Sequence, residues 1–209
     1  MVSRYEEYLP HKSDKYKRFP AHQTLAYQYH FHDKPIVNIW VEIFLQKMIE
    51  KGFLIPNNRP VFKTICTYDI DQAWAFRNKE WVRVIAGGVK SLYQGKFKVF
   101  FDRILTRMTL KQDPFDTFKL MLDYKQKYNL KVVMFFLLGR FSRYDKNISI
   151  NNKEFRSLIK QMSDYFDIGI HPSYIASENV NSLKTELGNL CKLLNNDVYK
   201  SRQNFIKID

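Results

Sequence analysis

The chain has 209 residues, 45% of them apolar and 16% aromatic, so it can bury a sizeable core and is not intrinsically disordered. Its 34 Lys and Arg residues against 21 Asp and Glu give a formal charge of +13. The basic residues are scattered rather than gathered in a run, which favours a solvated face over a nucleic-acid-binding surface.

The first 58 residues are expected to form an N-terminal arm and helix. Residues 1–35 are polar and aromatic with three prolines, which predicts little regular structure. A helix is expected from Asn38 to a stop at Gly52, with a proline-rich loop at 56–60. We therefore place a boundary between residues 58 and 59, with the main domain over 59–209.

Apolar runs predict the strands of that domain. Residues 61–68 suit a buried strand, and 131–138 are apolar on both faces, as in a central parallel strand. A short strand is expected at 167–170 and a fourth at 198–201.

Helical patterns lie between these strands. A long helical stretch reaches about residue 108, and Asp113-Pro114 predicts the start of a helix that runs to about Tyr128. Two further helices follow, with apolar stripes that include Phe155, Leu158, Ile159 and Met162 in one and Leu183, Leu187, Leu190 and Leu194 in the other. The alternation predicts a parallel α/β fold, either an open sheet or the first half of a barrel, because four strands cannot close one.

Polar side chains follow the predicted strands. Asp69 and Asp71, the loop 140–145, His171 and Arg202 should meet at one edge, because ligands of parallel α/β folds bind at the carboxyl ends of strands. Two carboxylates so close together can act as metal ligand and general base. The simpler alternatives are a helix-capping Asp pair, a hydrogen-bonded histidine and a surface arginine.

Five motifs in this order resemble the polysaccharide deacetylases of carbohydrate esterase family four. They are TYDID at 67–71, DPFDTF at 113–118, FFLLG at 135–139 with YDKNIS at 144–149, GIHPSY at 169–174 and KSRQNF at 200–205. The segments VSRYEEY at 2–8 and VNIW at 37–40 resemble the region that precedes this domain in a bacterial branch of the family.

The resemblance implies a distorted (β/α) barrel, of which this chain covers the first half, and hydrolytic removal of N-acetyl groups from amino-sugar polymers. By the same resemblance, Asp69 is the catalytic base, Arg202 positions it, and Asp71 and His171 bind a divalent metal, expected to be zinc. The implied partner is an N-acetylated carbohydrate.

Two positions depart from the family pattern. Ile175 stands where the second histidine of the metal motif is expected, and Asn204 replaces a histidine often found after the arginine motif. Zinc normally takes three or more protein ligands, so the expected set is incomplete. A catalytically inactive homologue that binds glycan is therefore the second hypothesis, and a basic nucleic-acid-binding module is the third.

The location of the protein is also an expectation. No secretory signal is visible, and the longest apolar run, 132–138, is too short to span a bilayer. Cys66 and Cys191 are distant in sequence and fit two reduced thiols better than a bridge. We expect a cytoplasmic protein without a membrane span, and we interpret the abrupt end after a strand-like stretch as that of a fragment.

Overall fold

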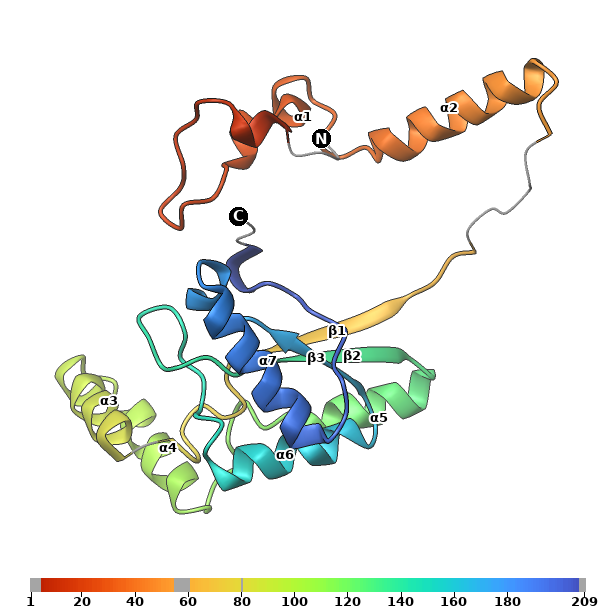
Figure 1. Cartoon of the computed structure of the whole chain (residues 1–209). Helices are drawn as coiled ribbons and strands as arrows, with labels where there is room; N and C mark the ends of the chain where they lie inside the picture. Colours follow the sequence, from red (N-terminus) through yellow and green to blue (C-terminus); the bar gives the residue numbers. More distant parts are fainter. Residues whose placement is uncertain (1–4, 55–60, 80, 207–209) are drawn as a thin grey trace. The chain divides into compact units, whose positions relative to one another are not determined.

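A computed structural model describes residues 5–54, 61–79 and 81–206 (Figure 1). The chain divides into two compact units, Met1–Lys63 and Thr64–Asp209, and each is described by itself. The loop expected at 56–60, the boundary expected between residues 58 and 59, and the first residues of the motif at 2–8 lie outside the described residues.

The first unit is mostly short helical turns followed by one long helix. Two 3-10 turns, η1 (Tyr5–Tyr8) and η2 (Ala21–Gln23), precede the short α1 (Leu25–Gln28) and the long α2 (Ile36–Glu50). The expectation of little regular structure before residue 35 is therefore confirmed. The helix expected from Asn38 begins two residues earlier, directly after a proline, and it ends at Glu50, two residues before Gly52, whose φ of 84° favours glycine.

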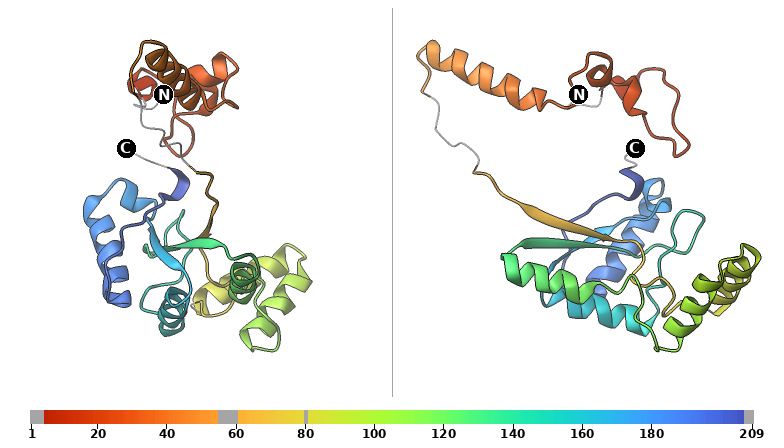
Figure 2. Two further views of the ribbon diagram at one scale, coloured as in Figure 1. Left: turned by 90° about the vertical axis from the view of Figure 1, so that its right-hand side faces the viewer. Right: turned by 180° about the vertical axis from the view of Figure 1, so that it is seen from behind.

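The second unit is a mixed α/β structure built on a parallel sheet. Its three strands are β1 (Ile65–Ile70), β2 (Lys131–Leu137) and β3 (Asp167–His171), in the order β1-β2-β3. Figures 1 and 2 show the sheet with helices packed along it. The predicted parallel α/β class is confirmed, and the strand predicted at 131–138 matches β2 closely.

Helices follow each of these strands along the chain. They are α3 (Trp81–Tyr93), α4 (Phe97–Arg107), α5 (Phe118–Tyr128), α6 (Lys153–Ser163), η3 (Ile175–Ser177), α7 (Val180–Leu194) and η4 (Asn204–Ile206). Asn152 and Asn179 cap α6 and α7 by accepting backbone N–H groups three residues on. No helix in the described part of the chain is long and apolar enough to cross a membrane.

One face of the sheet forms the hydrophobic core. Side chains at alternate strand positions, such as Ile70, Met134, Phe136 and Ile170, pack against the apolar stripes of α5, α6 and α7. The stripe predicted for α6 is buried throughout, at Phe155, Leu158, Ile159 and Met162.

The opposite face of the sheet carries the polar residues singled out from the sequence. The register pairs Asp69 with Phe135 and Phe135 with Gly169, so these three positions form one row across the sheet. Because side chains alternate between faces, the residues of this row point away from the helical core. Asp71 and His171 share the same face one step further along.

Several predictions about element limits were wrong. The first strand starts later than residue 61 and includes Asp69, so this carboxylate lies within β1 rather than after it. The helical stretch up to residue 108 is two helices, because the chain turns at Gly95, where φ is 68°. Asp113-Pro114 does not start α5, which begins at Phe118.

The fourth predicted strand is reduced to a single bridge. Ser201 pairs in parallel with Ile170, and the Ile170 N–H donates to the Lys200 carbonyl while the Arg202 N–H donates to the Ile170 carbonyl. These bonds hold the segment against β3 over a few residues only. That is nevertheless enough to bring Arg202 to the edge where the three strands end.

Candidate functional site

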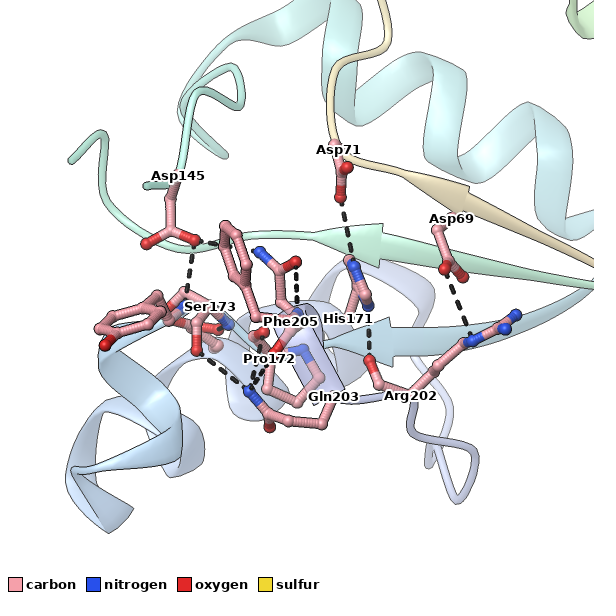
Figure 3. A network of polar contacts seen from close by, with 12 residues as sticks. Asp69, Asp71, Asp145, His171, Pro172, Ser173, Arg202, Gln203 and Phe205 are labelled. Atoms are coloured by element: carbon pink, nitrogen blue, oxygen red, sulfur yellow. Dashed lines mark hydrogen bonds and ion pairs between the residues drawn. The ribbon is translucent and has the colours of Figure 1, made fainter. Parts of the chain in front are cut away.

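The polar residues predicted to meet lie in two adjacent pairs at the carboxyl end of the sheet (Figure 3). Ile70, Phe136 and Ile170 form the last complete row of the register. Asp71 and His171 each follow that row by one residue, so strand geometry alone places them at the same level. Arg202 reaches the same edge through the bridge at Ser201.

Asp69 is paired with Arg202. Arg202 Nε lies 3.5 Å from Asp69 Oδ2, and its Nη1 donates to the Thr67 hydroxyl at 2.6 Å. Thr67 and Asp69 are two residues apart on one strand, so they point to the same face and hold the guanidinium from two sides. The side chains of Asp69 and Arg202 are 34% and 50% exposed, which keeps the carboxylate accessible to a ligand.

Gly169 makes room for this pairing. A Cβ there would lie 2.5 Å from the Phe135 ring and 2.8 Å from the Lys200 carbonyl oxygen. The missing side chain therefore lets the segment before Arg202 approach the sheet closely. This places the arginine over the row that contains Asp69.

Asp71 is paired with His171. The imidazole Nε2 lies 3.2 Å from Asp71 Oδ1, while Nδ1 contacts the backbone carbonyl oxygen of Arg202. A carbonyl only accepts, so Nδ1 carries a proton and the neutral ring presents the lone pair of Nε2 to the carboxylate. Two acceptors that face each other require a cation between them, either a proton or a metal ion.

The electrostatics of His171 reflect that arrangement. Burial by itself lowers the pKa of His171, whose side chain is only 5% exposed. The hydrogen bonds to Asp71 and to the Arg202 carbonyl, together with the charges of Asp69 and Asp71, outweigh burial and raise the pKa above the ordinary 6.5. The folded site therefore binds a proton on the imidazole more tightly than a free histidine does.

The Asp71 carboxylate and the His171 imidazole could also occupy two coordination positions of a divalent cation. Tetrahedral zinc bound at about 2.0–2.1 Å separates neighbouring ligand atoms by about 3.3 Å, close to the Asp71–His171 spacing. Fixing of the second ring nitrogen by a carbonyl is the usual arrangement for a metal-binding histidine. The chemistry of imidazole and carboxylate thus suits a cation with remaining positions open to water and substrate.

A third protein ligand is not found among the described residues, where no group of three His, Cys, Asp or Glu side chains could hold a metal. Ile175 has an exposed apolar side chain in η3. The Asn204 amide donates to Asp145 Oδ1 at 3.3 Å, so it is engaged elsewhere.

Asp145, from the predicted loop 140–145, does not join the two pairs of the site but supports the loops beside them. Its buried carboxylate accepts hydrogen bonds from the Tyr174 backbone N–H and the Ser142 hydroxyl. It therefore ties the loop after β2 to the loop after His171. Arg140, at the start of the predicted loop, is exposed.

Glu186, from α7, also holds the loop that follows His171. Its Oε1 accepts from the Ser173 hydroxyl at 2.6 Å and its Oε2 from the Ser173 N–H at 3.0 Å. Burial, the largest cause, raises the pKa of Glu186, with Asp145 adding to the shift while the Ser173 bonds oppose it. Two buried carboxylates thus fix the backbone immediately after His171.

Asp113 fixes the backbone that follows Asp71 in a similar way. Its buried carboxylate accepts backbone N–H bonds from Ala75 at 2.7 Å, from Phe76 at 2.8 Å and from Arg77 at 2.9 Å. It also accepts the Phe115 N–H at 3.0 Å. The turn that follows β1 is therefore pinned to the segment that precedes α5.

Sequence reasoning missed these supporting residues, although a signal existed for two of them. Glu186 lies three residues after Leu183 and four before Leu190, so a charged residue occupies the apolar stripe of α7. A charge on a buried face indicates a polar partner in the fold. Asp113 had been noticed, but as the cap of the helix beside it.

Comparisons with known proteins give one family match. A model described as a family of unknown function (DUF7033) matches residues 1–53, about a quarter of the chain. No curated protein and no solved structure matches significantly.

Proposed function

We propose that the protein is a metal-dependent hydrolase that removes N-acetyl groups from amino-sugar polysaccharide or its precursors. The observation that carries the proposal is the double pairing of Asp69 with Arg202 and Asp71 with His171 at one sheet edge. An accessible carboxylate beside a two-donor cation site can supply a general base and a polarised carbonyl for amide hydrolysis. The five ordered motifs of the sequence support the deacetylase assignment.

Each residue of the site has a distinct role in this proposal. Asp69 is the general base that takes a proton from the attacking water, and the Arg202 guanidinium orients it. Asp71 and His171 would hold a divalent metal, which we propose is zinc. When bound, the metal polarises the acyl carbonyl and offsets the negative charge that develops on its oxygen.

The arrangement of strands and helices also supports the partial (β/α) barrel that the resemblance implies. Strands added in the order β1-β2-β3 by right-handed crossovers place α5 and α6 on the same face of the sheet. The shared core with α5, α6 and α7 agrees with that arrangement. A doubly wound sheet would instead have helices on both faces, so we propose an arc of a deacetylase-type (β/α) barrel.

The test is release of acetate from an N-acetylglucosamine oligomer by the full-length protein with added zinc. Asp69→Asn should reduce the rate by at least about a hundredfold, because a general base contributes on this scale. Asp71→Asn should weaken zinc binding as well as the rate. Asp123→Asn, an exposed position on α5, is the matched control and should leave both unchanged. Equal rates for wild type and Asp69→Asn would remove Asp69 from the mechanism.

A second candidate is a homologue that binds glycan without hydrolysing it. It is favoured by Ile175 and the engaged Asn204, which leave the cation with two protein donors in the described part of the chain. Metal analysis separates the two candidates. Stoichiometric zinc in the purified full-length protein supports the hydrolase, whereas glycan binding without metal or acetate release supports the binding protein.

A further inference from the structure

A depression of about 430 Å³ lies beside the two aspartates of the site. Asp69, Asp71 and Gln72 line it from the β1 side, and Phe115, Thr117 and Phe118 line it from the segment that enters α5. Its size falls in the range of small-ligand sites. It is therefore placed to receive the part of a ligand next to the group that Asp69 and Asp71 would engage.

The aromatic side chain in this depression is exposed but held in place. Phe115 is 49% exposed, whereas Phe118 is buried. The Phe115 N–H donates to the buried Asp113 carboxylate, which also pins the turn after Asp71. The Thr117 N–H in turn donates to the Phe115 carbonyl, which closes a tight turn. The backbone of Phe115 is thus held beside the site, with its side chain partly exposed to solvent.

The rest of the lining is polar. Thr117 and Gln72 line the depression, and Gln72 Oε1 accepts a hydrogen bond from Lys79 Nζ at 2.6 Å. A flat aromatic face with hydrogen-bonding groups around it complements a pyranose ring, which has one C–H face and a rim of hydroxyl groups.

We propose that this depression is a sugar subsite in which Phe115 stacks on the ring adjacent to the one that reacts. The inference rests on the proposed function and deepens it, because it makes the substrate an oligosaccharide rather than a single amino sugar. Phe115 then makes longer oligosaccharides bind more tightly than a single sugar, and it takes no part in the hydrolytic step.

The experiment measures binding rather than turnover, by calorimetry on the full-length, metal-free protein. The probes are N-acetylglucosamine and its tetramer. The wild type should bind the tetramer about tenfold more tightly than the monomer, and Phe115→Leu should lose about that factor for the tetramer alone. Phe115→Tyr keeps the ring and should retain the affinity. Leucine keeps an apolar side chain at a half-exposed position, so the fold should persist.

Tyr128→Ala is the matched control. Tyr128 is 57% exposed and ends α5, about 16 Å along the helix from its start. Its removal should change neither affinity. Unchanged tetramer affinity in Phe115→Leu, or a wild type without preference for the tetramer, overturns the subsite.

The experiments distinguish failure of the proposed hydrolase function from failure of the proposed sugar subsite. Tetramer preference that depends on Phe115, without acetate release in the zinc-loaded protein, supports the subsite and rejects the hydrolase. Acetate release with a KM that Phe115→Leu leaves unchanged supports the hydrolase and rejects the subsite.

Discussion

His171 and Arg202 hold each other through the backbone as well as through the site. The imidazole Nδ1 donates to the Arg202 carbonyl, and the Arg202 N–H donates to the carbonyl of Ile170, the residue before His171. The side chain of Arg202 meanwhile points to Asp69 (Figure 3). One residue therefore sets the tautomer of the histidine with its backbone and orients the proposed base with its side chain.

This division predicts that Arg202→Lys separates hydrolysis from metal binding. Lysine keeps the backbone carbonyl and the charge but cannot contact Asp69 and Thr67 at once, so kcat/KM should fall about tenfold or more. Zinc affinity, measured by calorimetry, should stay near the wild-type value. Arg156→Lys on the exposed face of α6 serves as control. An unchanged kcat/KM in Arg202→Lys would contradict the positioning role.

Asp113→Asn should lower the free energy of unfolding, and the loss should be larger at neutral pH than at acidic pH. Replacing a buried acceptor of four N–H groups by an amide should cost about 2–3 kcal/mol of unfolding free energy in denaturant titrations.

The pH dependence follows from the pKa of Asp113. Burial raises it, but the four backbone N–H bonds lower it more, so the folded value lies below 3.8. The stabilisation is present above the unfolded value and is lost as pH falls through the folded pKa. The difference between wild type and Asp113→Asn should therefore shrink below about pH 3.8. A difference that stays constant on acidification would refute the role of the charge.

Glu186→Ala should loosen the loop after His171. It leaves the Ser173 N–H and hydroxyl without their acceptor, at a cost of about 2 kcal/mol in unfolding free energy. Glu154→Ala, in the exposed first turn of α6, should be close to neutral. Faster amide hydrogen exchange at Ser173 and Tyr174 would locate the effect, and unchanged exchange there would argue against it.

Glu186→Gln tests the charge of the same residue. The folded pKa of Glu186 lies above 4.5, so its contribution to stability is present below that value and is lost as pH rises through the folded pKa. Glutamine has no such loss. The wild type should therefore lose stability relative to Glu186→Gln as pH rises above 4.5, and parallel stability curves would disprove the assignment.

Two glycine substitutions should have opposite effects. A Cβ at Gly169 would meet the Phe135 ring and the Lys200 carbonyl, so Gly169→Ala should cost about 1–3 kcal/mol and displace the segment that carries Arg202. A Cβ at Gly188, inside α7, meets nothing within 4 Å, so Gly188→Ala should stabilise by about 0.5–1 kcal/mol. Thermal unfolding checks both, and equal effects would contradict the close approach at Gly169.

The sequence by itself determined the positions of the main strands and helices and the meeting of Asp71 and His171 at one edge of the sheet. Apolar runs and helical stripes are local patterns, so they identified β2, α6 and α7 without knowledge of the fold. Because strands of a parallel sheet end at one edge, the convergence of Asp71 and His171 also followed from the alternation of elements.

Only the tertiary structure decided the partners of each side chain. Arg202 contacts Thr67 across 135 positions of sequence, and Asp113 and Glu186 act on backbone groups of other segments. Such hydrogen bonds depend on strand register and on how closely segments approach, for example at Gly169. Local periodicity carries no information about either quantity, so the pairs that define the site appear only when the chain is folded.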